Sequence, residues 1–134
     1  MPALLDTNAI SDLMANHPPI LVRAKNYSSG RLHTCTIAVG EIRYGIERLP
    51  TGKRRSHLET RSQQVLSSLL IEPITDPISD EYGRLKASLE AQGLNLNDND
   101  LWIAATALTL NFTLISRDKI FTRIPGLMVE DWSQ

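Results

Sequence analysis

Short apolar runs alternate with helix-length segments along the whole chain, and this alternation limits the possible folds more than any other feature. Such runs, rich in apolar and β-branched residues, are typical of buried strands. They are Ala3–Leu5, Leu32–Thr36, Leu70–Ile74, Phe112–Ser116 and Leu127–Val129. Strands that alternate with helices form a mostly parallel sheet covered on both faces. The pattern therefore predicts an α/β fold, a three-layer α/β/α sandwich with about five strands.

Four of the intervening segments carry a helical pattern. Three of them repeat apolar residues at helical spacing, whereas the fourth is apolar nearly all round and predicts a buried helix. These segments are Ile37–Leu49, Arg55–Leu69, Ser79–Ala91 and, for the buried helix, Leu101–Leu110. Gly93 interrupts the chain before the buried helix, and Pro125-Gly126 interrupts it again before the last strand.

The length of 134 residues favours a single domain over residues 1–134. Cys35 is the only cysteine, which excludes an intramolecular disulfide and predicts a buried structural thiol. The longest apolar-rich stretch covers residues 101–115, fewer than the roughly 20 that a membrane span needs. The chain also lacks a basic region followed by an apolar leader at its start. These features predict a cytoplasmic protein that does not contact a membrane.

Acidic residues occur where this architecture brings chain segments to one edge of the sheet. Asp6 follows the first strand, Asp118 lies two residues after the fourth, and Glu41 falls early in the helix after the second. Asp100 opens the buried helix, and Asp98 is its rival, because the two differ by about 200° of helical rotation. Ligands of such sheets bind beyond the carboxyl ends of the strands, so this edge is the candidate site.

Two of the acids also have a purely structural explanation. Asp6 suits a helix N-cap, and Asn97 with Asp100 suits a capping box. If the four carboxylates do converge, two of them ~4 Å apart repel by ~4 kcal/mol at an effective dielectric near 20, so the cluster requires cations. The donors are all oxygen, and the three histidines show no metal-ligand spacing. Hard cations, Mg²⁺ or Mn²⁺, are therefore favoured over Zn²⁺.

Several short motifs, taken in order, resemble one known family. "LLDTNAIS", "TIAVGEIRYGI", "DLWIAATAL" and "LISRDKIF" followed by "IPGLMVEDW" resemble PIN-domain proteins of the VapC toxin type, and the similarity runs from Leu4 to Trp132. It implies a metal-dependent endoribonuclease with Mg²⁺ or Mn²⁺ as cofactor, which leaves a 5′-phosphate and a 3′-hydroxyl. It also implies the toxin of a bacterial toxin–antitoxin pair.

The resemblance extends to partners. It implies a homodimer, a cognate VapB-like antitoxin whose tail blocks the active site, and a toxin–antitoxin complex that binds promoter DNA through the antitoxin.

The resemblance also assigns roles to individual residues. It implies that the four acids bind the metal and act in catalysis. They are Asp6, Glu41, Asp100 and Asp118. It implies that three small polar residues contact those acids or metal-bound water. They are Thr7, Asn8 and Ser116.

A basic segment adds a candidate RNA contact. Between Arg43 and Arg61 there are six Lys or Arg against two acids. Most such clusters are solvated helix faces. The alternative is that part of the segment, together with one further arginine, contacts the RNA backbone without recognising its sequence. The residues concerned are Lys53, Arg54, Arg55 and Arg117.

Other classes of protein place acids at strand ends. A phospho-receiver-like regulatory module has a second acid beside the first and a lysine after its last strand, but here Thr7-Asn8 follow Asp6, and the last strand leads into Glu130-Asp131. A haloacid-dehalogenase-like phosphatase needs Asp-x-Asp, where this chain has Asp6-Thr7-Asn8. A non-catalytic binding module is the remaining alternative, and the four acids argue against it.

Overall fold

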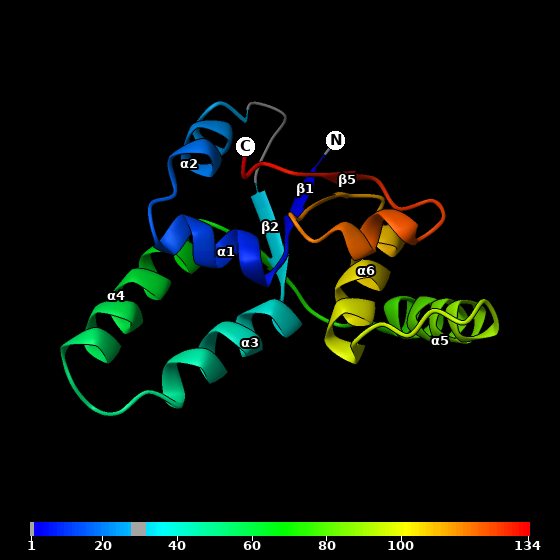
Figure 1. The fold of residues 1–134 in the computed structure, drawn as a ribbon, viewed down its shortest axis with the longest axis horizontal. Helices are drawn as coiled ribbons and strands as arrows, with labels where there is room; N and C mark the ends of the chain where they lie inside the picture. Colours follow the sequence, from blue (N-terminus) through cyan, green and yellow to red (C-terminus); the bar gives the residue numbers. More distant parts are fainter. Residues whose placement is uncertain (1, 28–31) are drawn as a thin grey trace.

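A five-stranded sheet lies at the centre of the protein in the computed structural model, which describes residues 2–27 and 32–134 (Figure 1). The strand order is β3-β2-β1-β4-β5, and all four neighbouring pairs are parallel. The strands are β1 (Ala3–Leu5), β2 (Leu32–Cys35), β3 (Leu70–Glu72), β4 (Thr113–Ile115) and β5 (Val129–Glu130). The predicted parallel sheet is confirmed.

Helices cover both faces of this sheet. They are α1 (Thr7–Met14), α2 (Pro18–Lys25), α3 (Thr36–Glu47), α4 (Lys53–Ser67), α5 (Asp76–Ala91) and α6 (Asp98–Leu110), with a 3₁₀ helix η1 (Lys119–Arg123) before β5. Figure 1 shows α1, α2 and α4 on one side of the sheet and α5 and α6 on the other. This arrangement is the predicted three-layer sandwich.

Several predicted boundaries were wrong by a few residues. The predicted strand Leu32–Thr36 ends at Cys35, because Thr36 already begins α3. The strand predicted to reach Ile74 ends at Glu72, directly before Pro73, which has no N–H to donate.

The last strand begins later than predicted, at Val129. The Leu127 N–H still donates to the Ile124 carbonyl in the preceding turn, where Gly126 has a φ of 81°. Only Gly tolerates this conformation at no steric cost. Gly93, with a φ of 77°, ends the α5 segment in the same way, so both predicted chain breaks are confirmed.

The core lies on both faces of the central strands, against α6 on one side and against α1 to α4 elsewhere. All three residues of β1 and all three of β4 are buried. The residues of α6 that are buried point in every direction around the helix, as predicted for Leu101–Leu110. Thr106 is accommodated there because its hydroxyl donates to the Trp102 carbonyl at 2.8 Å. Cys35 is fully buried, as expected.

The topology gathers helix starts at one edge of the sheet. β1 lies between β2 and β4, so the chain leaves it in one direction and returns on the other side. α1 and α3 begin directly after β1 and β2, and α6 runs back toward the start of β4. Their first turns therefore meet beyond the carboxyl ends of the strands, where α/β sheets bind ligands. No helix in the described parts of the chain is long and apolar enough to cross a membrane.

Candidate active site

Asp6 links the two central strands to the start of α1. Its backbone N–H donates to the Ile115 carbonyl at 3.2 Å, and its carboxylate accepts from the Ala9 N–H at 2.8 Å. The side chain is only 4% exposed. Burial raises the pKa of Asp6, while hydrogen bonds from Ser116 and Ala9 oppose the rise. The capping role is therefore real, and it holds the carboxylate at the sheet edge.

Ser116 connects Asp6 with Asp118. Its hydroxyl oxygen accepts from the Asp118 N–H at 3.0 Å, and its side chain hydrogen-bonds the Asp6 carboxylate. The Asp118 carboxylate, which is exposed, accepts from the Ile120 N–H at 3.0 Å and caps η1. One short polar side chain thus orients the acids that follow β1 and β4.

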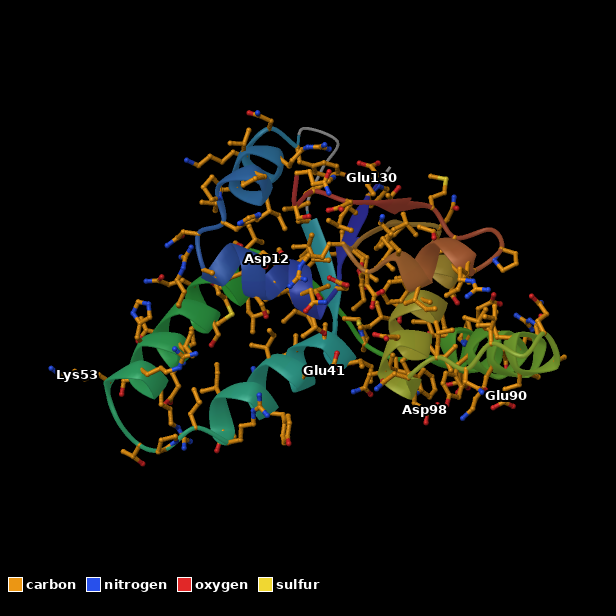
Figure 2. All side chains as sticks on the ribbon, in the orientation of Figure 1. Asp12, Glu41, Lys53, Glu90, Asp98 and Glu130 are labelled. Atoms are coloured by element: carbon orange, nitrogen blue, oxygen red, sulfur yellow. The ribbon has the colours of Figure 1, made fainter. Side chains whose placement is uncertain are left out.

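Glu41 is held between α1 and α6. The Thr7 hydroxyl donates to its Oε1, and the Asn99 side-chain amide donates to its Oε2 at 3.2 Å. Figure 2 shows the half-buried Glu41 early in α3, at the centre of the molecule. Both carboxylate oxygens are therefore oriented by side chains from other elements.

Asp100 completes the group. Burial, followed by the nearby Asp118, Glu41 and Asp6 carboxylates, raises the pKa of Asp100 from 3.8 to about 6. Carboxylates affect each other in this way only when they lie close together. The structure therefore brings all four predicted acids into one electrostatic cluster.

Asp98 points away from this cluster. Its carboxylate accepts from the Lys86 ammonium at 2.9 Å and from the Tyr82 hydroxyl at 2.8 Å, both on α5. These hydrogen bonds lower the pKa of Asp98 below its usual value. Figure 2 shows Asp98 at the outer end of α6, beside α5. The two rival acids of α6 thus face opposite sides of the helix.

The predicted capping box at the start of α6 is only half formed. The Asn97 side chain accepts from the Asn99 N–H at 2.8 Å, as an N-cap does. Among residues 2–27 and 32–134, the Asp100 carboxylate accepts no hydrogen bond from the Asn97 N–H. The capping alternative therefore holds for Asn97 but not for Asp100, whose carboxylate is left to face the cluster.

Arg117 and Asn8 also lie at this edge. The Arg117 guanidinium pairs with Asp12 on α1 at 3.2 Å and also stabilises the charged form of Asp6. Asn8 is half-buried in the first turn of α1, and no described residue hydrogen-bonds its amide.

The basic run at the start of α4 lies apart from the acids. Figure 2 places Lys53 at the outer end of α4, far from Glu41. Arg55 is occupied, since it donates to the carboxylates of Glu47 and Glu59 and to backbone carbonyls before α4. Lys53 and Arg54 are exposed, without an ion pair to any described residue. Contact of this run with RNA stays a prediction.

The donor set of the cluster fits a hard divalent cation. Its ligands are carboxylate oxygens, joined by the Thr7 and Ser116 hydroxyls. Within the described ranges, no three acidic, histidine or cysteine side chains are arranged to hold one ion directly. Mg²⁺ is compatible with such a donor set, because it usually retains several waters and is bound through one or two carboxylates.

Two residues of the site carried no signal in the sequence. Asn99 holds Glu41, yet an Asn in the first turn of a helix is ordinarily explained by capping. Asp12 holds Arg117, yet it is one of many acids on helix surfaces. Both contacts depend on how helices from different parts of the chain pack together, which residue spacing does not reveal.

Comparison with known proteins connects this geometry to a family. The PIN-domain family matches residues 3–127. Ribonuclease VapC2 from Rickettsia felis is 31% identical over 98% of both chains. VapBC-1 from nontypeable Haemophilus influenzae contains a chain of the same fold, with a TM-score of 0.87 and 31% identity over 100% of both chains. VapBC2 from Rickettsia felis, bound to a fragment of promoter DNA, gives a TM-score of 0.85 and 30% identity over 98% of this chain and 99% of the other.

Proposed function

This chain belongs to the PIN-domain family as a VapC-type ribonuclease, and from that premise we propose that it cleaves RNA with a divalent cation bound at the acid cluster. The cation is Mg²⁺ or Mn²⁺, and the residues that hold it, directly or through water, are Asp6, Glu41, Asp100 and Asp118. We further propose that the chain acts as one PIN domain over residues 1–134.

One observation carries this proposal. Partial burial, followed by three neighbouring carboxylates, raises the pKa of Asp100 to about 6. An acid cluster of this kind destabilises the protein when its members are ionised, because like charges in a half-buried site repel. A cation removes that repulsion, and perturbed acids at the carboxyl edge of a parallel sheet are typical of a catalytic site.

The residues around the cluster have different proposed roles. Ser116 hydrogen-bonds the Asp6 carboxylate and accepts the Asp118 backbone N–H, while Glu41 is oriented by Thr7 and Asn99. A bound divalent cation would supply an activated water and neutralise charge on the phosphate oxygens. Burial and then the neighbouring carboxylates raise the pKa of Asp100 to about 6, so a nearby positive charge would favour its ionised form.

We also propose an antitoxin as partner. A groove of about 300 Å³ between α1, α3 and α4 begins at Thr7 and Glu41 and continues over Met14, Ile42 and Ile46. The structurally similar chains occur in toxin–antitoxin complexes, and one such complex is bound to promoter DNA. An antitoxin segment with apolar side chains in this groove would reach the acid cluster and block RNA. The assembled pair would then contact DNA through the antitoxin.

Two matched variants test the proposed chemistry. Asp100→Asn removes one charge from the cluster and keeps the size of the side chain, so Mg²⁺-dependent RNA cleavage is expected to fall about 100-fold or more, equal to ~2.7 kcal/mol of transition-state stabilisation. Asp98→Asn makes the same change in the same helical turn, but on the α5 side, and is expected to retain most activity. Purified protein with a radiolabelled RNA, with Mg²⁺ or with EDTA, provides the measurement.

The opposite result has a clear meaning. If Asp98→Asn abolishes cleavage while Asp100→Asn cleaves normally, the acid assigned on α6 is wrong. If cleavage proceeds equally in EDTA, the divalent cation is wrong as well.

A further inference from the structure

A second cavity, of about 570 Å³, opens beside Glu41 on the outer face of α3. Thr7, Glu41 and Asn99 form its inner end, so it is continuous with the acid cluster. From there it follows α3 away from the cluster. It shares Thr7, Glu41 and Gly45 with the apolar groove between α1, α3 and α4, but it extends to the other side, toward Asn99 at the start of α6.

The floor of this cavity is formed by glycine. Gly40 and Gly45 both line it, and a Cβ atom placed on either would meet no other atom within 4 Å. The surface of α3 is therefore flat and open at these positions. A flat molecular fragment can approach the helix closely there, as it could not over larger side chains.

An exposed aromatic residue and an unpaired cation lie on the same helical face. Tyr44 is 68% exposed, which is unusual for a large ring, and Arg48 lies one turn further along α3. The Arg48 guanidinium is 5.8 Å from the centre of the Tyr44 ring. Among residues 2–27 and 32–134, no carboxylate pairs with Arg48. Positions 40, 44 and 48 are spaced four apart, so they form one continuous strip along the helix.

We propose that this strip binds a nucleotide of single-stranded RNA next to the cleaved bond, with its base stacked on Tyr44 and its phosphate on Arg48. The inference rests on the proposed ribonuclease function and adds a substrate-binding site to it. Aromatic side chains stack on any base, since every base has a π-face, and arginine positions the backbone without reading sequence. The cavity is therefore expected to bind single-stranded RNA without selecting a particular base.

The composition of the cavity favours RNA over a protein partner. Apart from Tyr44, the only large apolar side chain that lines it is Ile37, and the other lining residues are glycine, threonine, asparagine, arginine and, at the inner end, Glu41. The groove on the other side of α3 instead carries Met14, Ile42, Ile46 and Leu58. Protein segments gain affinity from buried aliphatic and aromatic anchors, which that other groove provides. α3 also leads from Glu41 toward the exposed Lys53 and Arg54 at the start of α4 (Figures 1 and 2), so a strand on Arg48 would continue onto positive charge.

Binding measurements in the Asp100→Asn background test this site without cleavage of the probe. Tyr44→Ala is expected to weaken binding of a fluorescent single-stranded oligoribonucleotide about tenfold, at low and at high salt alike, because stacking is not ionic. Tyr44→Phe keeps the ring and should bind within about twofold of the parent. Arg48→Ala should lose more at low salt and reduce the slope of log K against log salt by about 1. Arg43→Ala, an exposed cation on the same helix outside the cavity, is the matched control.

The outcomes separate this inference from the function on which it rests. If the wild-type protein cleaves RNA and both Tyr44→Ala and Arg48→Ala bind like Arg43→Ala, the nucleotide site is wrong and the ribonuclease stands. If the wild type neither binds nor cleaves RNA, both proposals are overturned. Sedimentation of each variant is the last check. A Tyr44→Ala protein that binds RNA normally but changes from dimer to monomer would show that this face joins two copies of the chain.

Discussion

Asp6 is buried, and its carboxylate accepts hydrogen bonds from the Ala9 N–H and from Ser116. The same group therefore caps α1 and belongs to the acid cluster. Ser116 has a similar double role, because it also receives the Asp118 N–H. At the scale of single residues, the same hydrogen bonds stabilise the fold and orient the site. The backbone N–H groups at the start of a helix also hold the carboxylate of a site residue.

Asp100 gives the clearest prediction at this scale, for protein without metal. Its pKa is about 6 in the folded protein against 3.8 in the unfolded chain. The folded state thus holds its proton more tightly, and ionisation costs stability as pH rises from about 4 to above 6. Asp100→Asn should therefore raise the thermal midpoint above pH 6, with the gain disappearing near pH 4. Thermal unfolding followed by circular dichroism in EDTA across this range is the measurement.

The control variant for this prediction, Asp98→Asn, should change the thermal midpoint in the opposite direction. The pKa of Asp98 is lowered by hydrogen bonds from Lys86 and Tyr82, so its carboxylate stabilises the fold at neutral pH and loses that contribution as pH falls. Asp98→Asn should slightly lower the midpoint at pH 7 and have no effect in acid. Equal shifts for both variants at every pH would contradict the environments described for the two acids.

At the scale of elements, one arginine joins α4 to the end of α1. The Arg61 guanidinium donates to the Leu13 carbonyl at 3.1 Å, to the Met14 carbonyl at 3.2 Å and to the Asn16 side chain at 2.6 Å. These carbonyls lie in the last turn of α1, where backbone acceptors lack helical partners and positive charge is favoured. Arg61 belongs to the basic segment of the sequence, yet it has a structural role.

Removal of this contact should destabilise the protein. Arg61→Ala removes the guanidinium from the Met14 and Leu13 carbonyls, of which Leu13 keeps the Asn16 N–H at 3.1 Å. The variant is expected to lower the free energy of unfolding by about 2 kcal/mol, the range for hydrogen bonds to a charged group. Urea titration followed by tryptophan fluorescence measures the change. Arg54→Ala removes an exposed, unpaired cation from the same helix and should stay within about 0.5 kcal/mol of the parent. A similar loss in both variants would mean that helix charge, rather than the contact with α1, is responsible.

The sequence predicted the elements whose signal is local. The apolar run Ala3–Leu5 and the all-round apolar Leu101–Leu110 needed no partner to be recognised as a buried strand and a buried helix. α1 and α2 were not predicted individually, because each has only eight residues and few periodic positions. Strand ends were missed by a few residues, since the partner strand decides them, and Thr36 suits a strand or a helix start equally well.

The site was predictable to the extent that topology determines it. The edge to which Asp6, Glu41 and Asp118 belong follows from parallel strands and the helices after them. Which acid of α6 faces that edge could not be derived from spacing alone, because the answer depends on the rotation of the helix against α5. The contact between Tyr82 and Asp98 reveals this rotation only in three dimensions.

At the scale of the whole molecule, the proposed metal site predicts that stability depends on divalent cations. The protein has a formal charge of only −1, yet four of its acids gather at one edge. An ion that binds the folded chain and not the unfolded one stabilises it by mass action, by ~2.7 kcal/mol at ~100 times its Kd. Mg²⁺ or Mn²⁺ should therefore raise the thermal midpoint of the wild type.

Two controls define this effect. NaCl at equal ionic strength reproduces the screening of charges but not the specific binding, so it should raise the midpoint less. Asp100→Asn should lose most of the rise caused by Mg²⁺. Scanning calorimetry gives the midpoints, and titration calorimetry gives the affinity. An unchanged midpoint together with no detectable heat of binding would contradict a metal site at this edge.

The position of β1 between β2 and β4 also has a consequence in time. Asp6 is synthesised well before β4, the strand that completes its surroundings, and before the acid that follows β4. At about 5–20 residues per second, the interval between Asp6 and Asp118 is on the order of 5–20 s. Until Asp118 has been added, the nascent chain holds Asp6 without that partner. A polypeptide whose translation stops before β4 therefore lacks the assembled cluster, so the chain must be made past β4 before the proposed site can form.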